Sequence, residues 1–370
     1  MSTIEVGHLV KKFGKMAAVD DVSFNVGNEI VSLLGPSGCG KTTTLRCIAG
    51  FEAPDRGKIS IMGEEMSDAQ KRVFVPTEKR GLGMVFQSYA LWPHMTVYDN
   101  VAYPLKIRKV QKQEIQDKVK KVLELMELGG LESRYPSQMS GGQQQRIALA
   151  RSIVYEPKVL LLDEPLSNLD FKMREKTRGE LRTLLKRIGI ASVYVTHDQE
   201  EAFVLSDRVI VMNKGKIVQE GSPTEIYSKP ADEFVGSFIG RANMLTAEIL
   251  GKNASDKIGH VKVKEFDDLE LECEIPEGLK VGESCWLLIR ANEVGLFDHR
   301  PKDERNVVEG SIIRREFRGP VTDHMIKVYS AMLIVTTHRF CPYSDTCADG
   351  DRVFVAIPIE AITLVPLDNQ

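Results

Sequence analysis

A glycine-rich segment near the start of the chain carries residue types suited to holding a phosphate group. It matches the pattern G-x-x-x-x-G-K-[ST] and reads Gly35, Pro36, Ser37, Gly38, Cys39, Gly40, Lys41, Thr42. Backbone N–H groups of such a loop, and the N-terminus of a following helix, attract an anion. Lys41 adds charge for the terminal phosphates, and the Thr42 hydroxyl can ligate Mg²⁺. The loop and its neighbour Thr43 therefore predict a nucleoside triphosphate site.

Short apolar runs predict the elements that position this loop. One run at residues 30–34 precedes it, and residues 43–49 have the pattern of a helix. Runs at 159–162 and 191–195 suit buried parallel strands, and another run, 83–86, lies between them and the loop in the sequence. A polar residue directly follows each of the last three runs, 83–86, 159–162 and 191–195. The residues at these three places are the next candidates for chemistry.

The residues that follow these runs can handle a metal ion and a water molecule. Asp163, at a strand tip, is placed to hold Mg²⁺ directly or through water. Its neighbour Glu164 can orient and deprotonate an attacking water, which is the general-base role. His197 can bridge the water and the γ-phosphate, and the Gln87 amide can reach the metal or the water. The sequence thus predicts hydrolysis of the bound triphosphate.

A second glycine-rich turn, which opens a predicted helix, narrows the class of protein. It reads Ser140, Gly141, Gly142, Gln143. This turn is one of seven features that follow one another along the chain. They are the aromatic Phe13, the phosphate loop, the amide Gln87, this turn, the acidic pair Asp163–Glu164, a loop at residues 167–170 that ends in Asp170, and His197. With this set in this order, the chain resembles the nucleotide-binding subunit of an ATP-binding-cassette (ABC) importer.

The resemblance implies a site shared between two subunits. In that family, two copies pack head to tail, and each ATP lies between the phosphate loop of one copy and the Ser-Gly-Gly-Gln turn of the other. Ser140, Gly141, Gly142, Gln143 and Asp170 would then contact the partner's nucleotide. ATP and Mg²⁺ are the implied cofactors, and ATP binding would close a homodimer that hydrolysis reopens.

Two departures from the family pattern are mild. Phe13 stands where the family commonly has Tyr, and stacking on adenine survives that exchange. Met139 replaces the usual Leu before Ser140, an apolar exchange of similar volume. Neither departure weakens the expectation of ATP hydrolysis.

The predicted architecture is a mixed α/β domain followed by an all-β domain. Residues 1–238 are expected to form the P-loop ABC ATPase domain, with a helical insertion at about 88–156, and residues 239–370 an OB-like barrel (TOBE) domain with a regulatory role. Eight short β-rich runs with turns between them predict the barrel: 244–250, 260–263, 269–274, 285–289, 310–317, 324–328, 332–336 and 352–357. This domain resembles the one appended to a subfamily of importers.

The transported solute is not specified by these motifs. Members of the subfamily serve importers of maltooligosaccharides, polyamines, ferric iron, sulfate or phosphonates. The segment 238–243 favours the iron and polyamine group, with sugar, sulfate and phosphonate as alternatives.

Composition agrees with a subunit that meets the membrane through other chains. The 370 residues carry 49 basic and 52 acidic side chains, a net charge of 49 − 52 = −3, which argues against a protein built to bind nucleic acid. No run reaches the ~18–20 apolar residues of a membrane span, and residues 1–10 lack a signal-peptide core. We therefore expect a peripheral protein on the cytoplasmic face of the membrane. Its partners would be two permease subunits and, indirectly, an extracytoplasmic solute-binding protein. The alternative is a soluble ABC ATPase acting on nucleic acid or ribosomes.

Three further segments have two interpretations each. Residues 114–128 form an amphipathic helix, expected to belong to the helical insertion rather than to bind a membrane. His338, Cys341 and Cys347 are close in sequence, but their spacing does not match a paired zinc pattern. Trp92 is expected to lie exposed, as a docking residue for a membrane subunit. Its alternative is to pack within the helical insertion.

Overall fold

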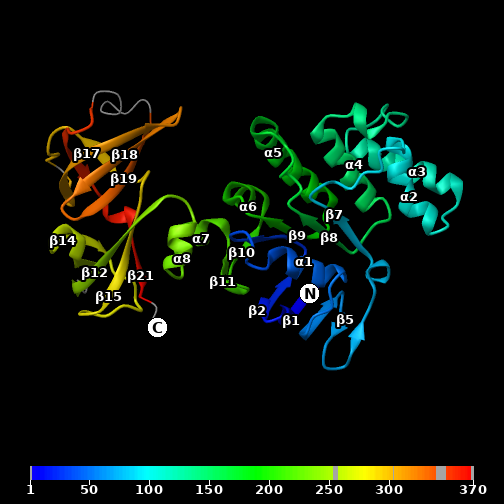
Figure 1. The fold of residues 1–370 in the computed structure, drawn as a ribbon, viewed down its shortest axis with the longest axis horizontal. Helices are drawn as coiled ribbons and strands as arrows, with labels where there is room; N and C mark the ends of the chain where they lie inside the picture. Colours follow the sequence, from blue (N-terminus) through cyan, green and yellow to red (C-terminus); the bar gives the residue numbers. More distant parts are fainter. Residues whose placement is uncertain (1, 253–256, 303, 339–346, 368–370) are drawn as a thin grey trace. The chain divides into compact units, whose positions relative to one another are not determined.

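A six-stranded, mostly parallel sheet holds the phosphate loop. The computed structural model describes residues 2–252, 257–302, 304–338 and 347–367 (Figure 1). The strand order is β11-β10-β3-β9-β8-β7, with bounds β3 Ile30–Leu34, β7 Leu82–Val85, β8 Val159–Asp163, β9 Ala191–Thr196, β10 Arg208–Asn213 and β11 Lys216–Gly221. Every residue of β3 and β9 is buried, because helices cover one face of the sheet, and a helix together with a second sheet covers the other. The predicted strands at 30–34, 159–162 and 191–195 are confirmed.

Helices follow the strands and begin near their carboxyl ends. The helices of this part of the chain are α1 Lys41–Ala49, α5 Phe171–Ile188 and α6 Gln199–Leu205. The strand β11 turns back from β10 as an antiparallel hairpin at the edge of the sheet. This arrangement is the α/β fold that the sequence predicts.

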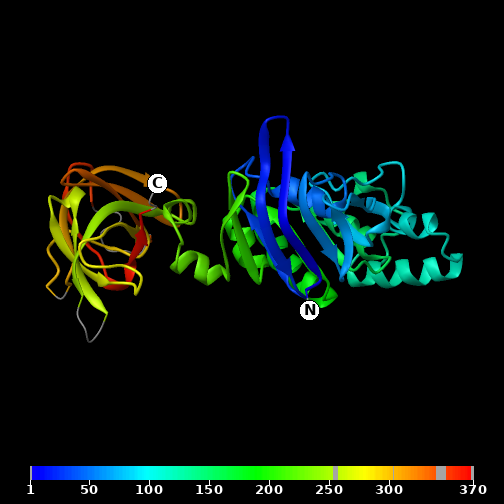
Figure 2. The same ribbon diagram turned by 90° about the horizontal axis from the view of Figure 1, so that it is seen from below.

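An antiparallel sheet accompanies the parallel one, and the sequence analysis did not identify it. Its order is β2-β1-β4-β5-β6, with bounds β1 Ile4–Phe13, β2 Met16–Val26, β4 Arg56–Ile61, β5 Glu64–Asp68 and β6 Val73–Phe74. The long β1–β2 hairpin stands out in Figure 2 and carries Phe13 at its turn. Arg80, which is 1% exposed, donates hydrogen bonds to Cys47 and Ile48 carbonyls of α1 and to the Ser67 hydroxyl of β5. It thus ties α1 to this sheet.

The segment between β7 and β8 forms the predicted helical insertion. Its helices are α2 Val97–Ile107, α3 Lys112–Leu125 and α4 Gly141–Ile153. The predicted helix at 114–128 is α3, and it buries Ile115, Val119 and Leu123 in the core that α2 and α4 share. Among the described residues, we find no helix with both the length and the apolar character that crossing a membrane requires.

The chain divides into two compact units, Met1–Pro223 and Thr224–Gln370. The predicted domain boundary, between residues 238 and 239, lies within the second unit. Two short helices lie at the start of that unit: α7 Pro223–Ser228, whose first residue belongs to the first unit, and α8 Glu233–Phe238.

Two five-stranded antiparallel sheets make up most of the remaining described residues of the second unit. One has the order β14-β13-β12-β15-β21, with bounds β12 Ala242–Lys252, β13 Ile258–Val263, β14 Leu269–Glu274, β15 Ser284–Arg290 and β21 Ile362–Pro366. The other has the order β16-β20-β17-β18-β19, with bounds β16 Gly295–Phe297, β17 Val307–Phe317, β18 Val321–Val328, β19 Ala331–His338 and β20 Arg352–Ala356. Both contribute to one apolar core. All eight predicted strands are present, whereas β16 and β21 were missed because one is three residues long and the other follows a 3₁₀ turn.

Candidate nucleotide-binding site

The phosphate loop is closed by its own lysine. Lys41, the first residue of α1, is 5% exposed, and its ammonium donates hydrogen bonds to the carbonyl oxygens of Gly35 at 2.8 Å and Pro36 at 2.9 Å. The ammonium therefore sits inside the loop rather than in solvent, where it can neutralise an anion that the loop holds. Ser37 and Gly38 form the exposed tip of the loop, and Thr43 is half-buried behind it.

Two glycines of the loop cannot be replaced without a clash. Gly40 has a φ of +106°, and a Cβ added there would meet the Ala18 carbonyl oxygen at 2.3 Å. A Cβ at Gly35 would lie 2.2 Å from the Met212 carbonyl oxygen and 2.7 Å from the Cys39 sulfur. The loop is thus pressed against neighbouring backbone, and only glycine fits at these points.

Thr42 and Asp163 supply oxygen atoms suited to Mg²⁺. The Thr42 hydroxyl donates to the Asp163 carboxylate at 3.2 Å, although 121 residues separate them in the sequence. Burial raises the pKa of the Asp163 carboxyl, while the Thr42 hydrogen bond lowers it. A hard cation prefers oxygen ligands and favours the charged carboxylate. These residues fit a metal ion beside the phosphate loop.

Glu164 lies at the meeting point of the two other residues predicted to act in hydrolysis. Its carboxylate is 3.2 Å from the His197 ring nitrogen Nδ1 and 3.5 Å from the Gln87 amide nitrogen. The backbone of Glu164 has a φ of +44°, a left-handed value that is uncommon for a residue with a side chain. This turn directs the carboxylate away from the strand and toward Gln87 and His197. The structure therefore brings Glu164, Gln87 and His197 together, beside Asp163.

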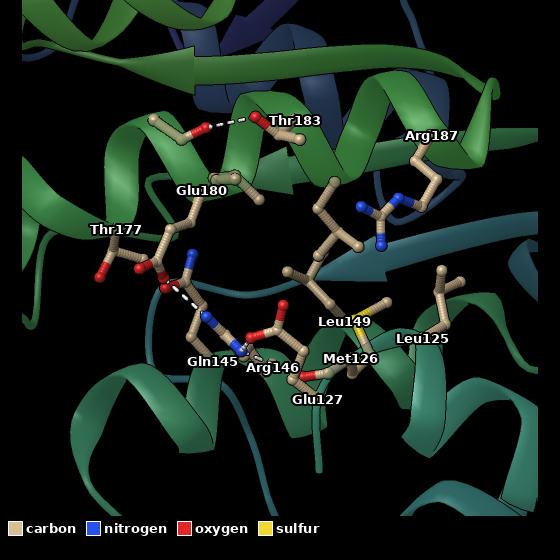
Figure 3. A pocket seen from close by; sticks show the side chains of 13 residues that line it. Leu125, Met126, Glu127, Gln145, Arg146, Leu149, Thr177, Glu180, Thr183 and Arg187 are labelled. Atoms are coloured by element: carbon tan, nitrogen blue, oxygen red, sulfur yellow. Dashed lines mark hydrogen bonds and ion pairs between the residues drawn. The ribbon is translucent and has the colours of Figure 1, made fainter.

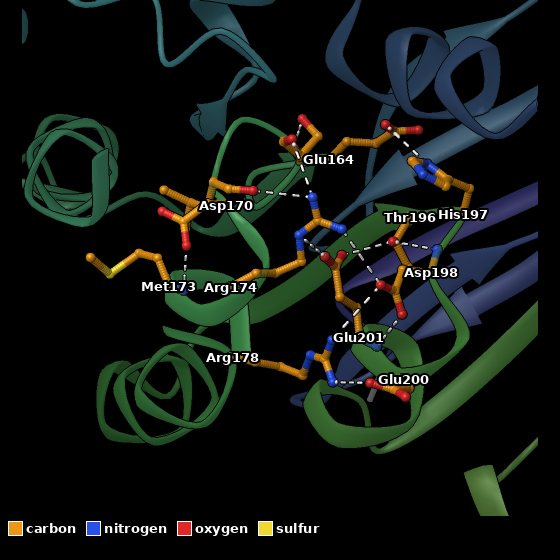
Figure 4. A network of polar contacts seen from close by, with 12 residues as sticks. Glu164, Asp170, Met173, Arg174, Arg178, Thr196, His197, Asp198, Glu200 and Glu201 are labelled. Atoms are coloured by element: carbon orange, nitrogen blue, oxygen red, sulfur yellow. Dashed lines mark hydrogen bonds and ion pairs between the residues drawn. The ribbon is translucent and has the colours of Figure 1, made fainter. Parts of the chain in front are cut away.

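A polar network behind the site was not anticipated from the sequence (Figure 4). Arg174 of α5 donates to the Leu169 carbonyl at 3.2 Å and lies 3.9 Å from Asp198, the residue after His197. Glu201, which is 3% exposed, accepts hydrogen bonds from the Tyr194 and Thr196 hydroxyls at 2.9 and 2.8 Å. Arg174 thus joins the loop after Glu164 to the end of the strand that carries His197.

Asn168 makes a second such connection. Its side-chain amide donates to the Gln87 backbone carbonyl at 2.6 Å. The sequence analysis included Asn168 in a motif but gave it no role. Arg174 lies one helical turn after Asp170, and this i, i+4 spacing was the only signal for it in the sequence.

The residues expected to act in trans lie at the starts of two helices. The Ser140 hydroxyl accepts from the Gln143 backbone at 3.4 Å as the N-cap of α4, while Gly141 and Gly142 form the first turn. The Asp170 carboxylate accepts from the Met173 backbone at 3.0 Å as the N-cap of α5. The hydrogen bonds described for Ser140 and Asp170 stay within their own helix starts. Phe13 is 47% exposed, with Lys11 over its ring.

Trp92 does not lie free on the surface, which corrects one expectation from the sequence. Its ring centroid is 4.4 Å from that of Tyr103 in α2, and the Arg151 guanidinium lies 4.7 Å from it. Its backbone N–H donates to the Asn100 side chain at 2.9 Å. The ring is half-buried, because the helical insertion offers it an aromatic and a cationic neighbour. Of the zinc candidates, His338 is exposed, Cys347 is buried and Cys341 lies outside the described residues.

Comparison with known proteins settles the family. Residues 19–167 match the family described as ABC transporter. The spermidine/putrescine import ATP-binding protein PotA of Chromobacterium violaceum is 43% identical over 365 residues, 98% of each chain. This chain belongs to the ATP-binding subunits of ABC importers. The trehalose/maltose import ATP-binding protein MalK of Thermococcus litoralis is 53% identical over 245 residues, 66% of each chain.

Solved structures agree with this assignment. CbiO1 from Clostridium perfringens, part of the ABC transporter complex CbiONQ, has a TM-score of 0.56 and 27% identity, covering 62% of this chain and 91% of its own. A dimeric ATP-binding cassette bound to ADP and Pi has a TM-score of 0.50 and 31% identity, covering 60% of this chain and 98% of its own. The predicted P-loop ATPase fold, ATP and Mg²⁺ as cofactors, and ATPase activity coupled to import are confirmed.

We expect Glu164→Gln to leave ATP binding intact and to lower turnover by roughly 10²–10⁴-fold, because an amide cannot take a proton from water. Steady-state ATPase assays and ATP titration by calorimetry measure the two effects. Glu175→Gln, an exposed position on α5, is the matched control. Turnover within about twofold of the parent would remove Glu164 from the catalytic role.

We expect Lys41→Ala to act on binding instead, because it removes the ammonium that closes the loop. ATP affinity measured by calorimetry should fall at least ~10-fold, which corresponds to ~1.4 kcal/mol. Lys120→Ala, at an exposed position of α3, should bind ATP as the parent does. Equal affinities for the two variants would mean that Lys41 does not contact the phosphates.

Proposed function

We propose that this chain powers the uptake of polyamine cations. The observation that carries the proposal is the extent of the likeness to the spermidine/putrescine import protein of Chromobacterium violaceum, which covers 98% of both chains and so includes the C-terminal unit. The likeness to the trehalose/maltose import protein is closer in identity but covers 66% of each chain. Sugar is therefore the second candidate solute, ahead of ferric iron, sulfate and phosphonate.

The proposed assembly is a homodimer on the cytoplasmic face of the membrane. Two permease subunits would form the channel, and an extracytoplasmic solute-binding protein would deliver the solute to them. An importer subunit acts through such membrane components, and the family assignment supports this arrangement. The near-neutral charge of −3 favours it over an ATPase that acts on nucleic acid or ribosomes.

Within each subunit, we assign roles from the geometry described above. The loop 35–43 and Lys41 hold the phosphates, and Phe13 stacks on adenine. Thr42 and Asp163 hold Mg²⁺, with Gln87 reaching the metal or the water. Glu164 takes the proton from the attacking water. His197, 3.2 Å from Glu164, orients that carboxylate and contacts the γ-phosphate.

The second half of each site comes from the other subunit. Ser140 and Asp170 are exposed at helix starts, where N–H groups and the helix dipole favour an anion. The likeness to a cassette that forms a dimer with ADP and Pi supports a shared site. Closure would then depend on contacts that neither subunit makes alone, and loss of the γ-phosphate would release them.

A permease would dock beside Gln87. Phe86 and Phe51 form a tilted ring pair with centroids 6.0 Å apart, and they are 36% and 45% exposed. Contiguous apolar groups on a surface can mark an interaction site. Because Phe86 directly precedes Gln87, a helix end from the permease pressed on this pair would displace the residue that contacts Glu164. Half-buried Trp92 would contribute its exposed edge.

Mixing two inactive variants tests the shared site. A dimer of one Lys41→Ala subunit with one Ser140→Arg subunit has one site with both defects and one site with neither, provided that Ser140 acts in trans. We expect the mixture to recover ATPase activity that each variant alone lacks. If no activity returns although crosslinking in ATP shows mixed dimers, the trans arrangement is wrong.

Transport in reconstituted vesicles tests the solute. We expect the subunit, assembled with its permease and solute-binding protein, to take up labelled spermidine in an ATP-dependent way, whereas labelled maltose stays outside. The assembly with Glu164→Gln is the control for energy coupling. Uptake of maltose without spermidine would replace the polyamine proposal by the sugar one. ATPase activity without uptake of either would reject both solutes.

A further inference from the structure

A cavity of about 360 Å³ lies between the end of α3, the middle of α4 and the outer half of α5 (Figure 3). Its volume is in the range of small-molecule sites. Leucine side chains from α4 and α5 form its apolar wall: Leu149, Leu181 and Leu184. None of the residues assigned to ATP, Mg²⁺ or hydrolysis lines it.

Gln145 is a buried amide without a partner at this cavity. Its side chain lies in the middle of α4 and is 1% exposed, and neither its Nε2 nor its Oε1 atom has a hydrogen bond among the described residues. Figure 3 shows the amide beside the hollow, near Thr177 and Glu180. Burying an amide with both donor and acceptor unpaired costs stability, which a ligand with a matching group would restore.

Two arginines line the cavity, and they differ in how closely acidic side chains pair with them. Arg146 is neutralised by Glu127 and Glu180, each 2.6 Å away, and it lowers the pKa of Glu127. Arg187, near the end of α5, makes no hydrogen bond or ion pair within the described parts of the chain, and its charge contributes only the smaller part of the lowering of the Glu127 pKa. It lies two helical turns beyond Glu180, and an arginine side chain leans back toward the start of its helix. Its guanidinium therefore faces the hollow from the end opposite Gln145 (Figure 3).

We propose that this cavity binds a small N-acylated amino acid with an aliphatic side chain. The amide of the ligand offers one acceptor and one donor, which match the Gln145 amide. Its aliphatic group fits against Leu149 and Leu184, and its carboxylate pairs with Arg187. The ligand is thus an organic acid with an amide, and not a nucleotide or a lipid.

Occupancy of the cavity regulates ATP turnover, an inference that rests on the trans contacts proposed above. Two of the helices that line the cavity, α4 and α5, begin at two residues assigned to the partner's nucleotide, Ser140 and Asp170. They already meet near these starts, since a Cβ on Gly142 would lie 3.8 Å from the Thr177 hydroxyl. A ligand bound between α4 and α5, further from their starts, sets the angle between the two helices. This angle determines the distance between Ser140 and Asp170.

Ligand-observed NMR on the full chain tests binding, with N-acetyl-L-leucine as the probe. Two analogues each lack one feature: N-acetyl-L-leucinamide lacks the carboxylate, and 4-methylpentanoate lacks the amide. We expect the probe to bind and each analogue to bind at least ~10-fold more weakly, a difference of ~1.4 kcal/mol. Absence of probe binding, or equal binding of all three compounds, would overturn the proposal.

Substitutions locate the binding. Gln145→Leu and Arg187→Ala should each lower the affinity for the probe by ~10-fold or more. The control variants Gln113→Leu and Arg134→Ala, at exposed positions, should bind the probe as the parent does. Gln145→Leu should also raise the melting temperature of the ligand-free chain, because it replaces an unpaired amide by an apolar side chain of similar size. A fall in the melting temperature would show that Gln145 is satisfied within the protein, and the site would be rejected.

An ATPase assay separates this inference from the proposed function. Saturating probe should change the turnover of the parent at least ~2-fold and leave that of Gln145→Leu unchanged. Binding at Gln145 without any change in turnover would keep the site but reject its regulatory role. Loss of the trans contacts is detected independently, by the mixing of Lys41→Ala and Ser140→Arg subunits.

Discussion

The parallel register of β3, β9 and β8 is the constraint on which the site depends. Leu34 pairs with Thr196, and Val195 pairs with Asp163, so the three strands end at one level. The phosphate loop, His197 and Glu164 begin directly after these ends. A slip of one residue would turn each side chain to the opposite face of the sheet. Because β3 and β9 are buried on both faces, such a slip would also place polar residues in the core.

The sharp turn at Glu164 is held from several sides. Its φ of +44° is a strained value, which persists in proteins only where neighbours fix it. The Glu164 N–H donates to the Val195 carbonyl at 3.0 Å, and the Glu164 carbonyl accepts from the Ser167 hydroxyl at 2.9 Å. Arg174 and Asn168 then connect the following loop to the ends of β9 and β7. The backbone contacts therefore fix the position of the Glu164 carboxylate without a nucleotide. A movement of Gln87 would act on this carboxylate directly, through the contact between the Gln87 amide and Glu164.

The sequence predicted best what depends on residues close to one another along the chain. The phosphate loop, the apolar strands and the acidic pair are local patterns, and the structure has them where expected. Arg80 and Arg174 could not be found in this way. Arg80 donates to carbonyls of α1, and Arg174 lies near the Asp198 carboxylate, and only the folded chain brings these partners near. The role of Gln145 could not be predicted from the sequence either. In the folded chain its amide has no partner among the described residues, whereas the amide of its neighbour Gln144 donates to the Pro136 carbonyl at 3.0 Å. Trp92 looked exposed in the sequence because Tyr103 and Arg151 are distant there.

In the first unit, the residues assigned to the nucleotide and those proposed to face a partner subunit lie on different elements. Asp163 ends a strand, and the phosphate loop and Glu164 follow strands, whose positions are fixed by the sheet. Ser140 and Asp170 start helices, and a helix packed through side chains can tilt where a strand in a sheet cannot. The ion pairs of Arg146 with Glu127 and Glu180 join α4 to the turn after α3 and to α5, on the border of a cavity rather than in a filled core. In the proposed dimer, a cavity at that point would let the two helix starts shift together, as a site completed by a second subunit would require.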